Sequence, residues 1–275
     1  MSIADRLGCS TISFRHLPLP EALTVITDLG FAEIDLGALP GVCDHVPYLL
    51  NRAAVSQVAA EVIASGLRVR SVNGDIGDLN GILNTEERAE RTEHLDRLVD
   101  LTAAVHGVAL VLPNGALRHD PIVNETADIA RVAVELIAAA ERAAGLDLEV
   151  WVESLHILRL CHTLDRAQRL TGELAGTTVG VVMDFSHVVA SGADPVEFVD
   201  LFGDRIRHVH LRDATPGYIH HSIGNGSVDF TTGIKALETA GYSGHFTLEL
   251  ETRDITNEER PAATGKAAAY ISSLL

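Results

Sequence analysis

Short apolar runs alternate with longer amphipathic stretches along the whole chain. Eight runs rich in aliphatic and β-branched residues predict strands. They are residues 8–13, 31–36, 67–72, 108–112, 147–153, 179–185, 206–211 and 246–250. Between these runs, apolar residues recur at helical spacing, as at Leu95, Leu98 and Val99. The stretches with this spacing include residues 53–65, 86–105, 124–144 and 162–173.

Strands that alternate with helices pair in parallel through crossover connections. Eight such units fill the chain, so the pattern predicts an α/β fold, a single (β/α)8 TIM barrel, with one domain over residues 1–275. A doubly wound sheet is disfavoured because no GxGxxG follows the first strand. The polar stretch 252–265 is expected to be a loop before a last helix at 266–274.

Composition narrows the class of protein. A hydrophobic content of 47% in 275 residues supports a large core and is compatible with the homo-oligomer that we expect. The net charge of −17 argues against a nucleic-acid partner, because such binding relies on Lys and Arg.

The lack of a recognisable targeting signal and the pattern of cysteines favour a cytoplasmic protein. The N-terminal residues lack the pattern of a signal peptide, and no long uncharged apolar stretch predicts contact with a membrane. Three cysteines, Cys9, Cys43 and Cys161, show no CxxC pair, so we expect no disulfide framework and a reducing cytoplasm.

Polar side chains gather at the predicted ends of four consecutive strands, where a (β/α)8 barrel carries its active site. They are Glu153, Asp184, His208, His210, Glu249 and Glu251. Carboxylates at the ends of buried strands are costly unless they are paired or bind a metal, so the cluster predicts a divalent metal site. Mixed oxygen and nitrogen ligands suit Mn²⁺, Co²⁺, Mg²⁺, Zn²⁺ or Fe²⁺. For His208, a structural role deeper in the barrel is an equal alternative to a role in the metal site.

At these residues the chain resembles the xylose-isomerase-like TIM barrel superfamily. This superfamily contains sugar phosphate isomerases and epimerases, ketose 3-epimerases, hydroxypyruvate isomerases, inosose dehydratases and endonuclease IV. The resembling segments are VWVES, MDFSH, HVHLRDA, HHSIGNGSVDF and FTLELE, with a weaker match at EIDLG in the second strand. They extend over nearly the whole chain.

The resemblance implies one divalent metal ion, with Mn²⁺ as the first expectation. The ligands that it implies are Glu153, Asp184, His210 and Glu249. Glu153 and Glu249 would also be the catalytic acid and base, and His187 would contact a substrate oxygen. Glu249 is preferred because it lies five residues after a glycine, as in the isomerases, whereas endonuclease IV favours the position of Glu251.

The chain also departs from two branches of the superfamily. The loops after strands three and four lack the histidines of endonuclease IV, and Tyr218 replaces an aspartate of its metal cluster. Arg159 and Pro216 stand where ketose 3-epimerases carry a glutamate and an arginine. We therefore expect a different set of substrate contacts, formed by His156, Arg159, His187 and His220. For Arg159, an ion pair on a helix surface is an equal alternative. Asn73, Asp75 and Asn114 are further candidates for lining the pocket.

These features together predict an enzyme of carbohydrate metabolism, a metal-dependent isomerase or epimerase with a small sugar or sugar derivative as its substrate. Its reaction would begin with removal of a proton next to a carbonyl, and the metal would stabilise the enediolate. The alternative is a metal-dependent lyase, similar to inosose or dehydroshikimate dehydratase. Non-catalytic binding of a metal or sugar and an apurinic endonuclease activity are weaker alternatives.

Overall fold

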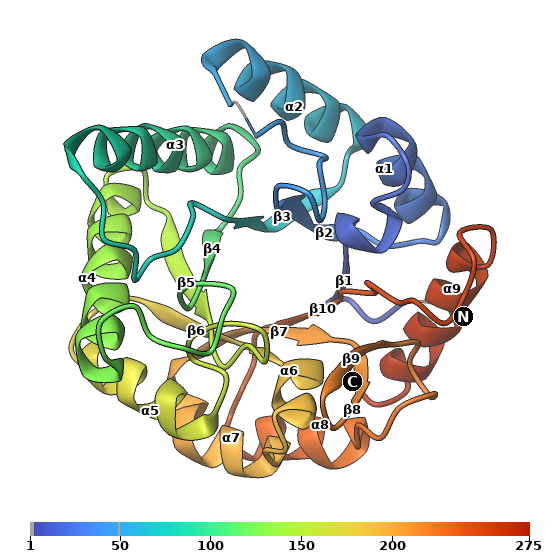
Figure 1. Ribbon diagram of the computed structural model, residues 1–275. Coiled ribbons are helices and arrows are strands. Elements are labelled where there is room, and N and C mark those ends of the chain that lie inside the picture. The colour runs from blue at the N-terminus through green and yellow to red at the C-terminus, as the bar shows by residue number, and fades with distance from the viewer. Residues whose placement is uncertain (1–2, 49) are drawn as a thin grey trace.

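The strands of the computed structural model, which describes residues 3–48 and 50–275, close into a parallel barrel (Figure 1). In order around the barrel they are β1 (Leu7–Ser10), β10 (His245–Leu248), β7 (Ile206–Leu211), β6 (Gly180–Asp184), β5 (Glu149–Glu153), β4 (Ala109–Pro113), β3 (Arg68–Gly74) and β2 (Glu33–Ala38). Each of the eight predicted strands is present, and the predicted α/β TIM barrel is confirmed.

Helices form a ring outside the strands (Figure 1). They are α1 (Leu19–Asp28), α2 (Arg52–Ser65), α3 (Thr85–Ala104), α4 (Glu125–Ala144), α5 (Leu164–Glu173), α6 (Phe185–Ala190), α7 (Pro195–Phe202), α8 (Phe230–Thr239) and α9 (Arg260–Ser272), with the 3₁₀ helices η1 (Thr11–Phe14) and η2 (Gly203–Arg205). Among the described residues, no helix has both the length and the apolar character needed to cross a membrane.

Side chains alternate between the barrel interior and the helical layer. Trp151 and Val182 belong to a small buried cluster that is separate from the main core. Glu153 and Asp184 follow them by two residues on the same strands, so they point to the same side of the sheet, nearer to the strand ends. The apolar interior therefore ends in a layer of carboxylates at the mouth of the barrel.

The start of the last helix was predicted wrongly. Helix α9 begins at Arg260, within the stretch that was expected to be a loop. Pro261 is compatible with the first turn of a helix, where its missing N–H costs no hydrogen bond. The buried Arg260 donates hydrogen bonds to the carbonyl oxygens of Leu250 (3.1 Å) and Thr252 (2.7 Å). These contacts fix the helix start against the segment after β10.

Candidate metal centre and active site

Four buried side chains converge at the carboxyl ends of neighbouring strands. Glu153 ends β5, Asp184 ends β6, His210 lies in β7 and Glu249 follows β10. One donor atom from each lies within 4.8 Å of the others. The parallel register places Asp184 beside His210, which explains why residues far apart in the sequence meet. The structure thus brings together the four residues that were predicted as metal ligands.

His210 lies at the centre of the group. Its Nδ1 atom is 3.3 Å from Glu153 Oε1 and 3.5 Å from Glu249 Oε2. Glu249 Oε1 accepts a hydrogen bond from the side-chain amide of Asn73 at 3.1 Å. The two glutamates therefore approach the same imidazole nitrogen from strands that are three steps apart around the barrel.

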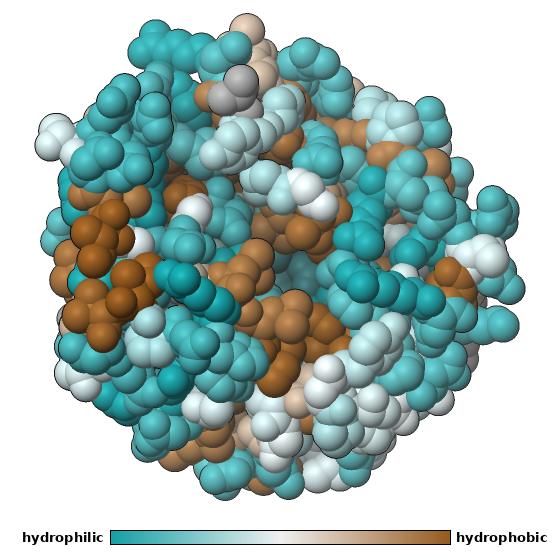
Figure 2. All heavy atoms as spheres, viewed as in Figure 1, coloured by the Kyte–Doolittle hydropathy of each residue, from teal (hydrophilic) through white to brown (hydrophobic). Residues whose placement is uncertain are grey.

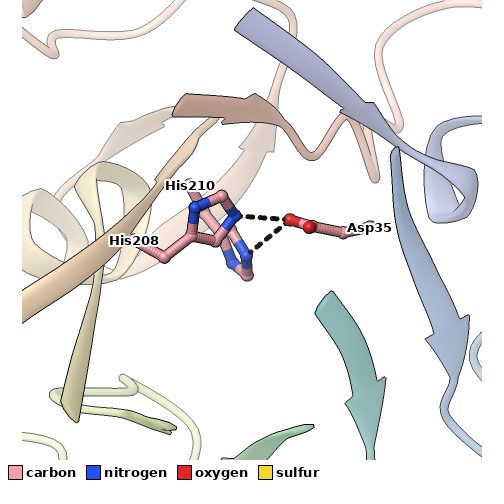
Figure 3. A group of neighbouring side chains, drawn as sticks. All are labelled: Asp35, His208 and His210. Carbon is pink, nitrogen blue, oxygen red and sulfur yellow. Dashed lines mark hydrogen bonds and ion pairs between the residues drawn. The ribbon is translucent and has the colours of Figure 1, made fainter. Parts of the chain in front are cut away.

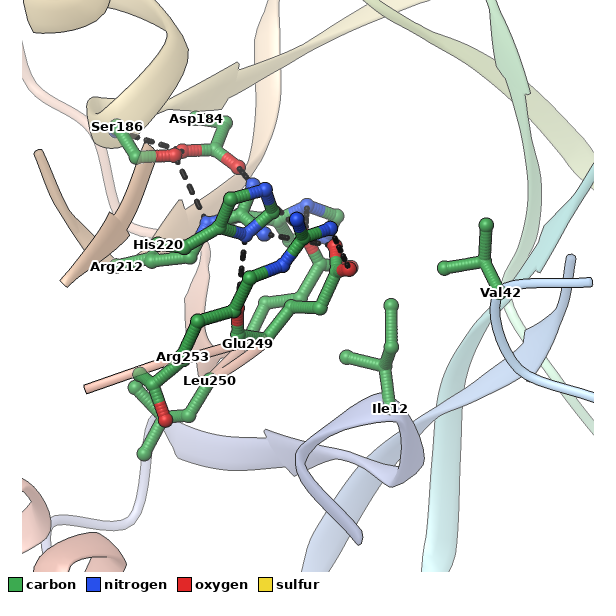
Figure 4. A network of polar contacts seen from close by, with 12 residues as sticks. Ile12, Val42, Asp184, Ser186, Arg212, His220, Glu249, Leu250 and Arg253 are labelled. Carbon is green, nitrogen blue, oxygen red and sulfur yellow. Dashed lines mark hydrogen bonds and ion pairs between the residues drawn. The ribbon is translucent and has the colours of Figure 1, made fainter. Parts of the chain in front are cut away.

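Asp184 is held on both of its oxygens (Figure 4). Its Oδ1 atom accepts hydrogen bonds from the backbone N–H (2.6 Å) and the hydroxyl (2.6 Å) of Ser186, so it caps helix α6. Its Oδ2 atom accepts a hydrogen bond from the guanidinium of Arg212 at 3.1 Å. The same guanidinium approaches Glu249 Oε2 at 3.9 Å.

Burial and mutual repulsion perturb the carboxylates. Burial raises the pKa of Glu249 to about 7, and the nearby Glu153 and Asp184 add to this effect. Burial would also raise the pKa of Glu153, but its hydrogen bond with His210 and the neighbouring His187 lower it well below its usual range. The environment thus favours the protonated form of Glu249 and the charged form of Glu153.

The donor set fits a divalent cation. Glu153, Asp184 and Glu249 supply carboxylate oxygens and His210 supplies an imidazole nitrogen, with Arg212 as the buried guanidinium in contact with the carboxylates. Hard oxygen ligands with one imidazole suit Mn²⁺, Zn²⁺ and related ions. A cation here would relieve the repulsion that raises the pKa of Glu249.

A cavity of about 260 Å³ opens above this group. Figure 2 shows the hollow near the centre of the molecule, with hydrophobic residues beside it. Its walls include all the residues that were predicted to contact substrate, His156, Arg159, His187 and His220, together with Glu153 and Glu249.

Two of the lining histidines form a stacked pair. The rings of His156 and His187 have centroids 3.7 Å apart. Burial lowers the pKa of His187 to about 3 and the pKa of His156 well below its usual value. His187 Nδ1 accepts a hydrogen bond from the backbone N–H of Ile157 at 3.3 Å, which orients the ring. Both imidazoles are therefore neutral at pH 7.

Arg159 is tied to the walls of the cavity. Its Nη2 atom lies 2.6 Å from Asp75 Oδ2, and its Nη1 atom donates to the carbonyl oxygen of Gly115 at 2.9 Å. Its Nε atom has no hydrogen-bond partner among the described residues. Of the further candidates, Asn73 and Asp75 line the cavity, whereas Asn114 is buried and is not among the residues of its wall.

His220 belongs to a hairpin that the sequence reasoning missed. Strands β8 (Asp213–Thr215) and β9 (Tyr218–His221) pair in antiparallel fashion after β7. The carboxylate of Asp213 accepts backbone hydrogen bonds from Gly224 (2.8 Å) and Gly226 (3.1 Å) in the following loop. His220 Nδ1 donates to the carbonyl oxygen of Glu251 at 2.9 Å. The glycines of the GNG motif are thus part of the support for His220.

Glu249 and Glu251, the two alternatives for the metal ligand of the eighth predicted strand, have different surroundings in the structure. Glu251 lies in an ion-pair network, 2.8 Å from Arg15 Nη1 and 3.3 Å from Arg212 Nη1. Glu249 belongs to the group around His210. Arg212 and Arg15 had no assigned role at the sequence level. Arg212 could have been found, because it continues the alternation of His208 and His210.

Comparison with known proteins agrees with the barrel fold. The family described as "Xylose isomerase-like TIM barrel" matches residues 23–274 of the chain. The chain belongs to this family. The resemblance stated from the strand-end motifs is confirmed.

Several relatives of the chain carry the names of enzymes. Inosose dehydratase of Geobacillus thermodenitrificans (strain NG80-2) is 31% identical over 107 residues, with 32% of this chain and 36% of that enzyme covered. Ketose 3-epimerase of Arthrobacter globiformis is 30% identical over 112 residues, with 40% of this chain and 37% of that enzyme covered. The chain thus matches little more than a third of the length of these curated relatives.

The fold agreement extends over the full chain. The crystal structure of the IolI protein with a bound zinc atom has a TM-score of 0.78 and 17% identity to this chain. The superposition covers 98% of this chain and 99% of IolI. At this identity the likeness concerns the fold alone.

Proposed function

We propose that this protein is a divalent-metal-dependent enzyme that removes a proton next to a carbonyl of a sugar or sugar derivative, and so isomerises or epimerises it. The observation that carries the proposal is the buried group of Glu153, Asp184, His210 and Glu249 beneath an open cavity. We further propose that residues 1–275 act as one cytoplasmic domain in a homo-oligomer, with no nucleic-acid or membrane partner.

These four residues would hold the ion, with Mn²⁺ as the first expectation and Zn²⁺, Co²⁺, Mg²⁺ or Fe²⁺ as alternatives. The zinc atom in the IolI structure supports a divalent ion in this fold family. When bound, the ion supplies Lewis acidity that makes a proton next to a substrate carbonyl easier to remove.

Glu153 and Glu249 are the proposed acid and base. Both line the cavity, and they come from strands that are three steps apart, so one carboxylate would face each side of a substrate carbon. A carboxylate within hydrogen-bond reach takes the proton, and the second carboxylate returns a proton from the opposite side. Return on the opposite side inverts the carbon, whereas return to the neighbouring carbon isomerises the substrate.

The remaining lining residues would bind and orient the substrate. His156 and His187 are neutral, so each offers a donor or an acceptor to a sugar hydroxyl without adding charge. Arg159 lines the cavity, and His220 lies on the hairpin at its edge. These side chains would exclude water from the reacting carbon.

A second candidate is a lyase that dehydrates an inosose or a related keto compound. The 31% identity to inosose dehydratase favours it. Both reactions begin with the same proton removal and differ in whether a hydroxyl group leaves from the adjacent carbon.

Solvent-deuterium incorporation distinguishes the candidates. The metal-loaded protein is incubated in D₂O with ketoses, keto-inositols and hydroxy-keto acids, and the products are measured by NMR and mass spectrometry. Deuterium at one carbon of a product that retains its hydroxyls supports isomerisation or epimerisation, and loss of water supports the lyase. Bound metal without exchange at any carbon contradicts both and favours a binding protein. Chelated wild type and the Glu249→Gln variant are the controls.

A further inference from the structure

A carboxylate that has no assigned role lies in the middle of the barrel. Asp35, on β2, is fully buried and faces two histidines of β7 (Figure 3). His208 Nε2 lies 2.7 Å from Asp35 Oδ2, and His210 Nε2 lies 3.3 Å from the same oxygen. Removing a carboxylate from water costs several kcal/mol, so a buried one needs specific partners.

His210 is contacted from opposite sides of its ring. Its Nε2 atom faces Asp35, while its Nδ1 atom faces Glu153 and Glu249. A neutral imidazole carries one proton, and a neighbouring carboxylate stabilises that proton on the nitrogen that it faces. In the metal-free protein Nδ1 donates a hydrogen bond to Glu153 Oε1 at 3.3 Å. A divalent ion would replace that proton, and a proton kept on Nε2 would leave the lone pair of Nδ1 for the ion.

His208 in turn fixes Asp35. Its shorter contact with Oδ2 anchors the carboxylate from a position two residues earlier on the same strand as His210. The ring of His208 lies against Trp151, with centroids 5.5 Å apart. Asp35 Oδ1, His208 Nδ1 and His210 Nε2 have no hydrogen-bond partner among the described residues. Asp35 is therefore held by the hydrogen bond of His208 to one oxygen, and His210 Nε2 makes a longer ion-pair contact with the same oxygen.

We propose that Asp35, held by His208, is a positioning residue that sets the tautomer and ring orientation of His210 for a divalent ion. This inference rests on the metal site of the proposed function. Outer carboxylates of this kind typically change metal affinity by about 10- to 100-fold when they are replaced.

Metal affinity of matched variants tests the role of Asp35. The Zn²⁺ dissociation constants of wild type, Asp35→Asn, His208→Gln and Ser71→Ala are measured by competition with a chromophoric chelator, and circular dichroism checks each fold. We expect the dissociation constant to rise about 10- to 100-fold in Asp35→Asn and by less in His208→Gln. Ser71→Ala is the control, because Ser71 pairs in register with Asp35, is buried and forms no side-chain hydrogen bond within the described residues.

The outcomes separate the two proposals. An unchanged affinity in a folded Asp35→Asn variant overturns the role of Asp35 and leaves the metal site intact. A wild-type protein that binds no Zn²⁺ overturns the proposed function instead. If Asp35→Asn does not fold, ¹⁵N NMR of the histidines in the Zn²⁺-loaded wild type tests the inference. Metal on Nδ1 and a proton on Nε2 of His210 are expected, and metal on Nε2 overturns the proposal.

Discussion

Arg212 Nη2 lies 3.1 Å from Asp184 Oδ2, and both side chains are buried at the mouth of the barrel. The neighbouring Glu249 and Glu251 approach the same guanidinium at 3.9 and 3.3 Å. One cation thus contacts three carboxylates and holds two strand ends together. Its pKa is raised, because the attraction of Asp184 and the glutamates outweighs the lowering effect of burial.

Replacing this cation should destabilise the metal-free protein. Arg212→Met leaves buried carboxylates without their partner, and loss of one member of a buried ion pair costs about 3–5 kcal/mol. Urea unfolding in the presence of a chelator measures the change, and added divalent metal should restore part of the loss. Arg253→Met is the matched control, since the exposed Arg253 contacts only the edge of this network through Glu251 and should cost under about 1 kcal/mol. Equal losses in both variants would contradict the role given to Arg212.

The two glutamates after β10 should respond differently to the same substitution. Glu249→Gln removes a proposed ligand and acid–base group, so we expect kcat to fall by about 10²- to 10⁴-fold and metal affinity to drop. Glu251→Gln alters an ion pair with Arg15 and Arg212 and should retain the metal. Metal titration and deuterium exchange of both variants check this. Loss of metal in Glu251→Gln alone would reverse the assignment.

Asp128 connects the loop after β3 with the loop after β4, and its charge should make the free energy of unfolding depend on pH. Asp128 accepts hydrogen bonds from the side chain of Asn80 (2.8 Å) and the backbone N–H groups of Ile122 (2.6 Å) and Val123 (3.1 Å). Burial would raise the pKa of Asp128, but these bonds lower it below its usual value. A lowered pKa gives stability that is fully present above the ordinary aspartate pKa of about 3.9 and is lost as the pH falls further.

Asp128→Asn should therefore lower the free energy of unfolding by about 1–3 kcal/mol at pH 7, because backbone donors lose a charged acceptor. The gap between the variant and wild type should narrow below about pH 4. Denaturant unfolding across this range measures both. A gap that stays constant down to acid pH would show that the charge of Asp128 has no part in stability.

The glycine beneath the hairpin should be intolerant of a side chain. A Cβ atom on Gly226 would lie 2.3 Å from Asp213 Oδ1 and 2.5 Å from the carbonyl oxygen of Ala214. Gly226→Ala should displace the loop and, with it, His220. We therefore expect a clear rise in KM and only a small fall in the melting temperature. Gly172→Ala in α5 is the control, because its Cβ would meet no atom within 4 Å. Unchanged kinetics in Gly226→Ala would separate His220 from substrate binding.

The fold could be predicted because its signals are local. Strand and helix periods are read from neighbouring residues, and the strands at 147–153 and 179–185 already contained Glu153 and Asp184 at their ends. Helix α9 was misjudged because the burial of Arg260 depends on carbonyl oxygens of another segment. Polar residues alone give no sign of such a contact.

The site could be predicted only in part, because some of its contacts join segments that are far apart in the sequence. The parity of strand residues predicts which side chains share a face, so His208 with His210 and Glu249 with Glu251 were found as pairs. The resemblance to the isomerases then selected His210 and Glu249 as ligands. The partnership of Asp35 with His208 crosses the barrel interior from β2 to β7, and spacing along the chain does not encode that distance. The hairpin β8–β9 depends on the carboxylate of Asp213, which accepts hydrogen bonds from four backbone N–H groups. These contacts are visible only in the three-dimensional structure.

Metal stoichiometry tests the central claim most directly. Wild type, Glu153→Gln, Asp184→Asn and Glu249→Gln are loaded with Mn²⁺ or Zn²⁺, passed over a desalting column and assayed by elemental mass spectrometry. The account predicts one ion per chain in the wild type and a large loss in each variant, with folds confirmed by circular dichroism. A wild type that retains no divalent ion, or variants that retain it as well as the wild type, would contradict it.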